Sequence, residues 1–526
     1  MAFLRRPCES AGETVRAPVQ TSGAATWVLI VAIAGSSMTF IDANAVSVAL
    51  PAMQRELNAD AADLQWVVEG YALFLSALIL IGGSLGDIFG RRRIFVAGIV
   101  LFALASSLAC AASRSVLVLD IARCVQGVGG ALATPGSLAL ISSNFSDSDR
   151  GRAIGTWSGF AAITAALGPL LGGWLAQHAS WRYVFLINVP LAVFVVIAAF
   201  ARVPESRDEA AKRSIDVTGA LLVTSALAAL TFGLIRLQVA GTDLAGAIAA
   251  GSGVLLLGAF VFCEARESAP MVPLAIFRNA TFSGANVYTF FLYAALGGSL
   301  YFVPFDLQNI QGYSPTAAGA AMLPFIIIMF ALSRWSGSLV ATTGARVPLI
   351  VGAVVAAVGF LAYARAAAGG SYWTTFFPAS VILGFGGALF VAPLTTTVME
   401  AGDAKHAGLA SGINNAVSRV AGLLAIAALG IVLLASFYGE FDRVVPALHV
   451  SVRTQQLLAR DREALGTGKP LEALAEPDRT AVNDLLRRSY TLGFERVMAI
   501  SAAFALLAAL VVVPTVPSRV RSRVNR

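Results

Sequence analysis

Three charged side chains lie inside apolar stretches of the sequence, where a charge is costly. Asp42, Glu69 and Arg123 stand about eight, five and seven residues from the same end of their stretches. At about 1.5 Å per helical residue, all three fall in one layer roughly 8 to 12 Å below that end. Charges buried in a membrane usually mark the path of an ion or a substrate. We therefore predict that this layer carries protons, with Arg123 holding one of the two carboxylates ionised.

The same residue types also allow a purely structural interpretation. An ion pair between Arg123 and either Asp42 or Asp120 could do no more than fix the packing of two helices. Glu69 is close enough to the end of its stretch to be wetted by solvent. The sequence leaves both interpretations open.

The composition places these residues in a polytopic membrane protein. The chain has 526 residues, of which 57% are hydrophobic and 13% charged. Its mean hydropathy is +0.77. Many stretches are long enough to cross a bilayer, so we expect an all-α protein with about 14 transmembrane helices. They cover about 27–50, 64–86, 94–112, 116–140, 153–176, 183–201, 217–237, 244–262, 280–303, 317–340, 348–367, 373–398, 408–437 and 497–513, with Pro51 ending the first.

Residues that would support enzyme chemistry do not form recognisable motifs. The four cysteines and three histidines show no metal-ligand spacing, and there is no nucleophile elbow, phosphate loop or cofactor fingerprint. We therefore expect no enzyme activity, no metal and no cofactor, with the proton motive force as the energy source. The net charge of +7 follows from arginines in loops and does not indicate nucleic acid.

Two segments, far apart in the chain, repeat one pattern. Both contain Gly-Ser-Leu with a second glycine seven residues after the first and an arginine nine after it. Two further matches follow at a similar offset: Gly127 to Leu132 with Gly384 to Leu389, and Gly155 with Gly412. Collinear matches predict a duplication, as in transporters built from two repeats. The residues that we expect to form a conformational gate are Gly83, Asp87, Gly90, Arg91, Gly337, Gly344 and Arg346.

The first copy of this pattern has features of a helix end at the cytoplasmic boundary. Gly82, Gly86 and Gly90 recur every fourth residue, which predicts a bare helix face that a neighbouring helix can approach closely. Asp87 and Arg91, also four apart, can pair with each other. The arginines that follow favour the cytoplasmic side.

The fifth stretch is rich in glycine and contains a proline. Small residues permit close packing, and the proline removes a helix hydrogen bond, so we expect this helix to bend or pack tightly at a moving interface. The residues concerned are Gly155, Gly168, Pro169, Gly172 and Gly173.

Polar stretches divide the chain into five parts. We expect cytoplasmic tails at 1–24 and 515–526, six-helix bundles at 25–205 and 266–514, and an inserted helix pair at 206–265. The loop 147–152 is assigned to the cytoplasm and the segment 438–490 to the outside. Spacing of Val452, Leu457, Leu458 and Leu465 favours a short amphipathic helix in that segment, with a solvated loop as the alternative.

The second half lacks the charges of the first at equivalent positions. Ser380 stands in place of Arg123, and Ala341 in place of Asp87. We therefore assign proton coupling to the first half. Asn286, Tyr288, Asn414 and Asn415 are candidates for a substrate surface, with ordinary interhelical packing as the alternative.

These motifs together resemble the major facilitator superfamily, in particular the fourteen-helix drug:proton antiporters of the EmrB/QacA type. Gly83 to Arg92 resembles the loop signature after the second helix, and Asp42 to Pro51 the first-helix signature. Arg123 with Gln126-Gly127 resembles the fourth-helix signature, whose arginine is implicated in proton transfer. The glycines of the fifth stretch resemble the antiporter signature. This chain departs from the signatures at Asn44, Thr164 and Ala341, positions that bear on substrate and gating.

The resemblance implies a proton-coupled exporter of small hydrophobic or cationic compounds that works by alternating access between two six-helix bundles. We expect a monomer in the bacterial inner membrane with both termini in the cytoplasm. A dedicated exporter of one metabolite, such as a siderophore, an antibiotic or an amino acid, stays open as an alternative. So does a periplasmic adaptor with an outer-membrane channel, while a membrane-embedded enzyme or receptor is a remote alternative.

Overall fold

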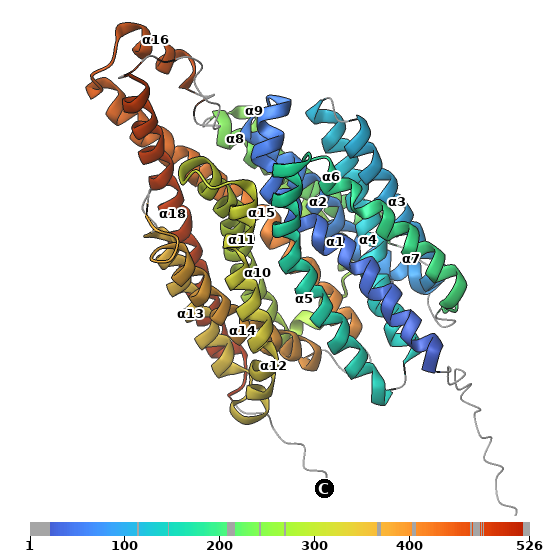
Figure 1. Cartoon of the computed structure of the whole chain (residues 1–526). Coiled ribbons are helices and arrows are strands. Elements are labelled where there is room, and N and C mark those ends of the chain that lie inside the picture. Colours follow the sequence, from blue (N-terminus) through green and yellow to red (C-terminus); the bar gives the residue numbers. More distant parts are fainter. Residues whose placement is uncertain are drawn as a thin grey trace, which may run out of the picture.

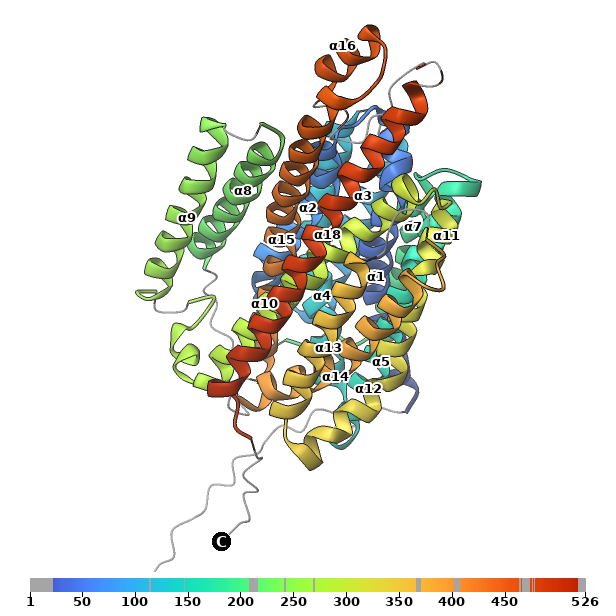
Figure 2. The same cartoon turned by 90° about the vertical axis from the view of Figure 1, so that its left-hand side faces the viewer.

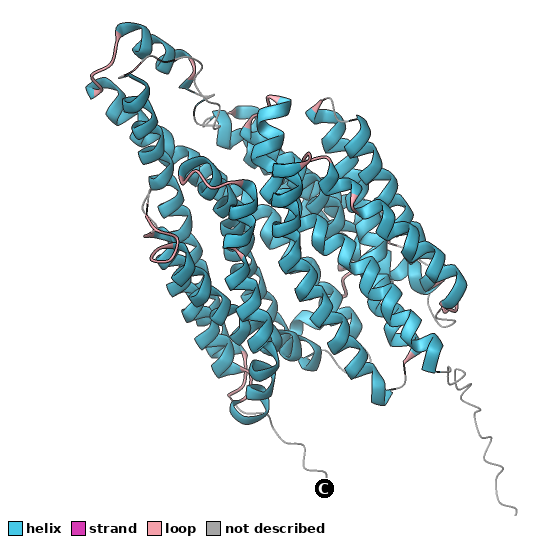
Figure 3. Cartoon of the chain, in the orientation of Figure 1, coloured by secondary structure: helices cyan, strands magenta, loops and turns pink. Residues whose placement is uncertain are grey.

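The computed structural model is built from long helices that lie side by side (Figure 1; Figure 3). It describes residues 22–112, 115–145, 147–207, 216–240, 243–267, 270–365, 370–401, 407–462, 465, 474, 476 and 478–518. Thirteen helical segments within these ranges are long and apolar enough to cross a membrane, and the 32-residue helix α5 (Asp147–His178) runs beside them. The expected multi-pass helical fold is thus confirmed.

The first half of the chain begins at Ser22. Its helices are α1 (Ser22–Leu57), α2 (Ala61–Phe89), α3 (Arg91–Ala112), α4 (Val116–Asn144), α5, the short α6 (Tyr183–Leu186) and α7 (Asn188–Arg202). The helix pair α8 (Val217–Ala240) and α9 (Leu244–Glu264) follows. Figure 2 shows this pair at one side of the molecule. Leu227 of α8 shares an apolar cluster with Leu73 of α2 and with Leu423.

The second half starts with the short helix η1 (Leu274–Arg278). It continues with α10 (Ala280–Phe305), η2 (Asp306–Ile310), α11 (Pro315–Ala321), α12 (Leu323–Thr343), α13 (Arg346–Ala364), α14 (Phe376–Ala401), α15 (Ala407–Val444), η3 (Val445–Ala447), α16 (Val452–Arg460) and α18 (Asp478–Thr515). Helix α15 contains Leu423, so α8 packs against one helix of each half.

Helix α16 lies at one end of the molecule, beyond the other helices (Figure 1). We call this the α16 end, and the opposite end, where α3 begins with three arginines, the arginine end. Phe437, Phe441, Leu458, Leu465, Val482 and Leu485 form a small apolar core beyond the main bundle. Helix α16 confirms the predicted short amphipathic helix, with Leu458 on its buried face. Two residues of the predicted pattern are not on that face: Val452 is 71% exposed, and the buried Leu465 lies beyond the end of α16.

Several helices extend past the predicted ends of their apolar stretches. Pro51 was expected to end the first helix, but it lies inside α1. The six residues after it, from Ala52 to Leu57, include good helix formers and continue the helix. The predicted loop 147–152 is wrong as well, since it forms the first turns of α5. Much of the segment 438–490 is likewise helical, because α15 runs to Val444 and α18 starts at Asp478.

The duplication inferred from the sequence is visible in backbone contacts. A methyl group added at Gly127 would lie 2.5 Å from the Tyr71 carbonyl oxygen, and one at Gly384 would lie 2.6 Å from that of Phe325. The pair Gly129 and Gly98 is matched in the same way by Gly386 and Gly352. The glycines therefore recur because each half needs the same close approach of its helices.

Gly90 and Gly344 form equivalent turns at the arginine end. Each caps the helix before it by donating its N–H to a carbonyl four residues back, Gly86 and Val340 respectively. Their φ angles are +114° and +75°, which side chains with a Cβ rarely adopt. The predicted bare face is present only in part: Gly82 lies against the backbone of Ala131, whereas Gly90 is needed for its turn.

We expect Gly344→Ala to lower the stability of the protein by about 1 to 3 kcal/mol, because alanine is strained at this backbone conformation. Thermal unfolding of the protein purified in detergent measures this effect. Gly251→Ala, on α9, is the matched control, since nothing lies within 4 Å of the added methyl group. Equal melting temperatures for the two variants would contradict the prediction.

Candidate functional site

Asp42 of α1 and Arg123 of α4 form a fully buried ion pair. Arg123 Nη1 lies 2.5 Å from Asp42 Oδ2, and the two side chains are 0% and 1% exposed. Gln126 and Asn188 donate their amide N–H groups to Asp42 Oδ1 at 2.8 and 3.0 Å. Three donors around one carboxyl group are the arrangement that suits an ionised carboxylate.

The Arg123 guanidinium is held from several sides. Its Nε donates to the Val67 carbonyl oxygen of α2 at 2.7 Å, and its Nη1 donates to Gln126 Oε1 at 2.6 Å. The guanidinium also lies 4.4 Å from the ring centre of Tyr71, a cation–π contact. Breaking a buried pair of this kind costs about 3 to 5 kcal/mol. The pair therefore joins α1, α2 and α4 and resists separation.

Two members of this cluster were missed by the sequence analysis. Asn188 begins α7, and Ser106 Oγ on α3 accepts a hydrogen bond from Gln126 at 2.8 Å. Both are buried polar residues inside apolar segments, the same signal that drew attention to Asp42. The site thus gathers side chains from α1, α3, α4 and α7, all in the first half.

Glu69 of α2 is separate from this cluster. Its side chain is completely buried, so the expectation that solvent wets it is wrong. Neither carboxyl oxygen has a hydrogen-bond partner among the described residues. Glu69 lies within electrostatic range of Tyr301 on α10, which belongs to the other half. The two acids of the predicted layer therefore have different surroundings. Asp42 is paired within the first half, whereas Glu69 has no hydrogen-bond partner among the described residues and lies within electrostatic range of the second half.

The second half carries a half-buried charge of its own, Arg419, that the sequence analysis missed. Arg419 is on α15, and its Nε has no hydrogen-bond partner among the described residues. It lies within electrostatic range of Tyr71 and Tyr293, one from each half. Ser380, the counterpart of Arg123, forms a neutral hydrogen bond of 2.7 Å with the Tyr363 hydroxyl.

The gate residues of the first copy form a compact cluster at the arginine end. Arg91 pairs with Asp87 at 2.9 Å, as their spacing predicted. Glu205, which follows α7, accepts backbone N–H bonds from Arg92 and Arg93 at 3.0 and 3.2 Å. This carboxylate, missed by the sequence analysis, caps the exposed N–H groups of α3. In the second copy, Gly337 lies on α12, Gly344 forms the turn and Arg346 begins α13.

The glycines of α5 face two different helices. Methyl groups added at Gly168 and Gly172 would collide with the backbone of α1 beside Asp42, at Ile41 and Ala45. A methyl group at Gly173 would collide with the Pro315 carbonyl oxygen of α11. Gly319 of α11 similarly lies against the carbonyl of Pro169. Helix α5 therefore lies between α1 of its own half and α11 of the other half. Gly155 is on the same helix, but its surroundings lie outside the described part.

The predicted substrate residues divide into three kinds of environment. Asn414 of α15 donates to Asn286 Oδ1 and Thr289 Oγ1 of α10 at 3.2 and 2.7 Å, so it links two helices of one half. Tyr288 is fully buried and donates its hydroxyl to the Leu349 carbonyl oxygen, which places it in the core. Asn415 is exposed.

Comparisons with known proteins agree with this architecture. A model of the Major Facilitator Superfamily matches residues 32–426. The chain is 33% identical to the tetracenomycin C resistance and export protein of Streptomyces glaucescens, over 92% of this chain and 90% of that protein. It is 36% identical to the multidrug resistance protein Stp of Mycobacterium tuberculosis, over 78% and 77%. A bacterial homologue of the lysosomal transporter Spinster, in an inward-facing and occupied conformation, superimposes with a TM-score of 0.64 at 15% identity, covering 94% and 97%.

Proposed function

The chain belongs to the Major Facilitator Superfamily, and on this premise we propose that it exports small hydrophobic or cationic compounds in exchange for protons. The observation that carries the proposal is the buried Asp42–Arg123 pair, whose side chains are at most 1% exposed and accept hydrogen bonds from, or donate them to, residues of α2, α4 and α7. Relatives named for drug resistance and export support the direction of transport. The proposed exchange includes no cofactor, because the proton motive force supplies its energy.

Asp42 is the proton carrier in this scheme. Its carboxyl group accepts hydrogen bonds from Arg123, Gln126 and Asn188, an arrangement that suits the ionised form. A proton on Asp42 removes the charge that holds Arg123 and weakens the link between α1 and α4. Protonation is thereby tied to movement of α1.

Helix α5 contacts both α1 and α11, so its packing can couple a movement of α1 to the second half. The residues of α1 that touch α5, from Ile41 to Ala45, flank Asp42 directly. Helix α5 in turn contacts α11 through Gly173 and Pro169. Gln308 also donates to the Val48 carbonyl oxygen at 3.0 Å, so the halves are in contact on the α16 side. A shift of α1 that accompanies protonation would therefore disturb the closure at the α16 end.

The proposed orientation follows from the arginines. Arg91, Arg92 and Arg93 favour the cytoplasm. In the proposed orientation, the α16 end is therefore on the outer side of a bacterial inner membrane and both termini are in the cytoplasm. The contact of α5 with α11 then closes the outer side. At about 100 mV and one pH unit, each proton supplies roughly 2.3 plus 1.4 kcal/mol, enough for about a 500-fold gradient of a neutral compound.

A dedicated exporter of one metabolite is the second candidate. The relative that matches over 92% of this chain is named for resistance to, and export of, a single antibiotic. The same site and helices would serve either function. The range of compounds exported decides between them.

Ethidium efflux from energised cells tests the proposal. Cells that express the protein should extrude the dye, and a protonophore should stop this extrusion. Extrusion that continues with the protonophore would contradict proton coupling. If neither ethidium nor other common cations are extruded, the broad multidrug function is wrong and the dedicated exporter becomes the leading candidate.

We expect Glu69→Gln to reduce uphill transport of cationic and neutral compounds alike. Glutamine has the same shape and the glutamate has no hydrogen bond to lose within the described residues, so stability should hardly change. If Glu69 carries one of the exchanged protons, the variant loses that proton, and the attainable concentration gradient of the exported compound falls about tenfold per unit of the pH difference. Steady-state accumulation ratios measure this. A loss confined to cationic compounds would instead make Glu69 a substrate-binding anion.

A further inference from the structure

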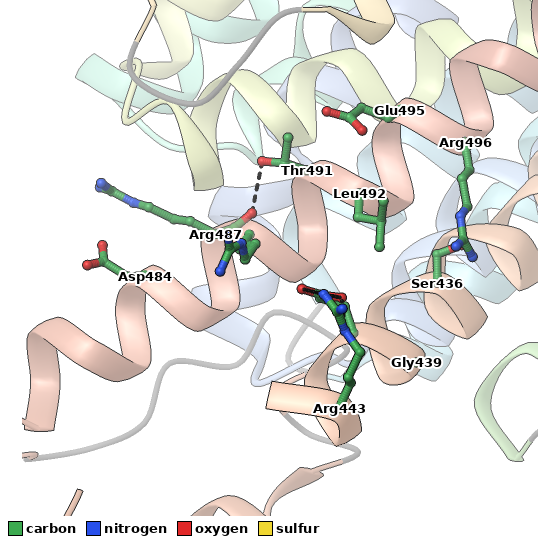
Figure 4. A pocket seen from close by; sticks show the side chains of 11 residues that line it. Ser436, Gly439, Arg443, Asp484, Arg487, Thr491, Leu492, Glu495 and Arg496 are labelled. Carbon is green, nitrogen blue, oxygen red and sulfur yellow. Dashed lines mark hydrogen bonds and ion pairs between the residues drawn. The ribbon is translucent and has the colours of Figure 1, made fainter. Parts of the chain in front are cut away.

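A large charged cavity lies between α15 and α18 near the α16 end, away from the buried ion pair. Its volume is about 910 Å³, which is sufficient for a small molecule or a lipid headgroup. Arg443 lines it from α15, and Arg487 and Arg496 line it from α18 (Figure 4). Nothing in the proposed transport cycle uses this cavity.

The lining carries four arginines and three carboxylates. Arg443 is already occupied, because its Nε and Nη2 bind Glu440 at 3.0 and 2.8 Å. By contrast, Arg487, Arg488 and Arg496 have no ion pair with any described carboxylate, and Arg496 donates only to Ser436 Oγ at 3.1 Å. Three unpaired guanidinium groups around one space form a good site for phosphate oxygens, which arginine binds through two parallel hydrogen bonds.

The depth of the cavity indicates where such a phosphate would be. The apolar stretch of α18 begins at Val497, directly after Arg496, and that of α15 ends at Phe437, directly after Ser436. The arginines extend from Arg496 back to Arg487, about 14 Å along the helix. The headgroup layer on each side of the hydrocarbon core is roughly 5 to 8 Å thick. The inner part of the cavity therefore lies at the level of the lipid phosphates.

We propose that this cavity binds the phosphate of a membrane phospholipid, with Arg488 and Arg496 as its main ligands. Glu440 holds Arg443 away from the ligand and lies within electrostatic range of both Arg488 and Arg496. With Asp484 and Glu495, it offsets three of the four arginine charges, so the lining keeps one net positive charge. The site belongs to the outer leaflet if the proposed orientation holds.

The test is lipid retention by the full-length protein, purified in detergent, measured by native mass spectrometry with added phosphatidylglycerol, phosphatidylethanolamine or inorganic phosphate. Wild type should retain phospholipid, and R488Q/R496Q should retain at least about tenfold less, as expected for the loss of charge-assisted hydrogen bonds. Arg479→Gln, on the same helix but outside the cavity and paired with Glu476, is the control and should retain lipid as wild type does.

A second variant guards against the possibility that the double variant fails to fold. Glu440→Gln releases Arg443 to the ligand, so it should retain more phospholipid than wild type, a gain that misfolding cannot produce. Equal retention by wild type, R488Q/R496Q and Glu440→Gln would overturn the proposal. Displacement of the lipid by millimolar inorganic phosphate would overturn the lipid assignment and identify a soluble phosphate as the ligand.

Discussion

Asp42→Asn is expected to abolish export of ethidium by energised cells. Asparagine cannot carry the proton, and it leaves the Arg123 guanidinium buried without its counter-ion. An unpaired buried charge costs about 3 to 5 kcal/mol, so the single variant should also unfold at a lower temperature. Efflux, protein level and melting temperature are therefore measured together.

The double variant D42N/R123Q separates loss of the proton carrier from loss of the fold. Removing both charges eliminates the unpaired cation, so the melting temperature should recover towards the wild-type value. Efflux should stay absent, because no group in the pair can then bind and release a proton. Recovery of efflux in the double variant would mean that the pair serves only to fix helix packing.

Gly173→Ala is expected to stop transport by a different route. Its added methyl group would collide with the Pro315 carbonyl oxygen, which is backbone and cannot rotate away. Because Pro315 is on α11, in the other half, the collision should prevent the two halves from closing at the α16 end. We expect efflux to fall to background while the melting temperature changes little, since each half can still fold.

Two glycine variants serve as controls for this prediction. Gly172→Ala collides with Ala45 of α1 inside the same half, so it should lower the melting temperature as well as efflux. Gly251→Ala meets nothing within 4 Å and should leave both unchanged or raise stability by up to about 1 kcal/mol through helix propensity. Normal efflux by Gly173→Ala would contradict the role assigned to the contact between α5 and α11.

The sequence predicted best those features that depend on local pattern. Apolar stretches located the helices, and the glycine spacing revealed the duplication, because helix approach without side chains leaves few alternatives to glycine. The sequence also placed Asp42 among the possible partners of Arg123, but only the structure shows that Asp42, and not Asp120 or Glu69, forms the ion pair. Pro51 was misleading because it was read as a helix end, whereas the residues after it continue the helix.

What the sequence could not supply is the direction in which each side chain points. Glu69 was grouped with Asp42 by depth alone, yet it interacts with α10 while Asp42 lies among helices of the first half. Arg419 lies in the apolar stretch 408–437 and shows the same signal as Asp42, a charge among apolar residues, yet it was not predicted as a site residue. Asn188 needed the fold to bring α7 against α1. Which face of a helix points towards a neighbouring helix depends on packing between segments that are far apart in the sequence, so local pattern alone does not predict it.

The most direct test of the central claim is proton movement in proteoliposomes that contain the purified protein and a trapped pH-sensitive dye. When a transported compound is added with no imposed gradient, wild type should move protons in the direction opposite to the compound. The folded double variant D42N/R123Q should move none. Transport of the compound by wild type without any proton movement, or equal proton movement by both proteins, would contradict proton exchange at Asp42.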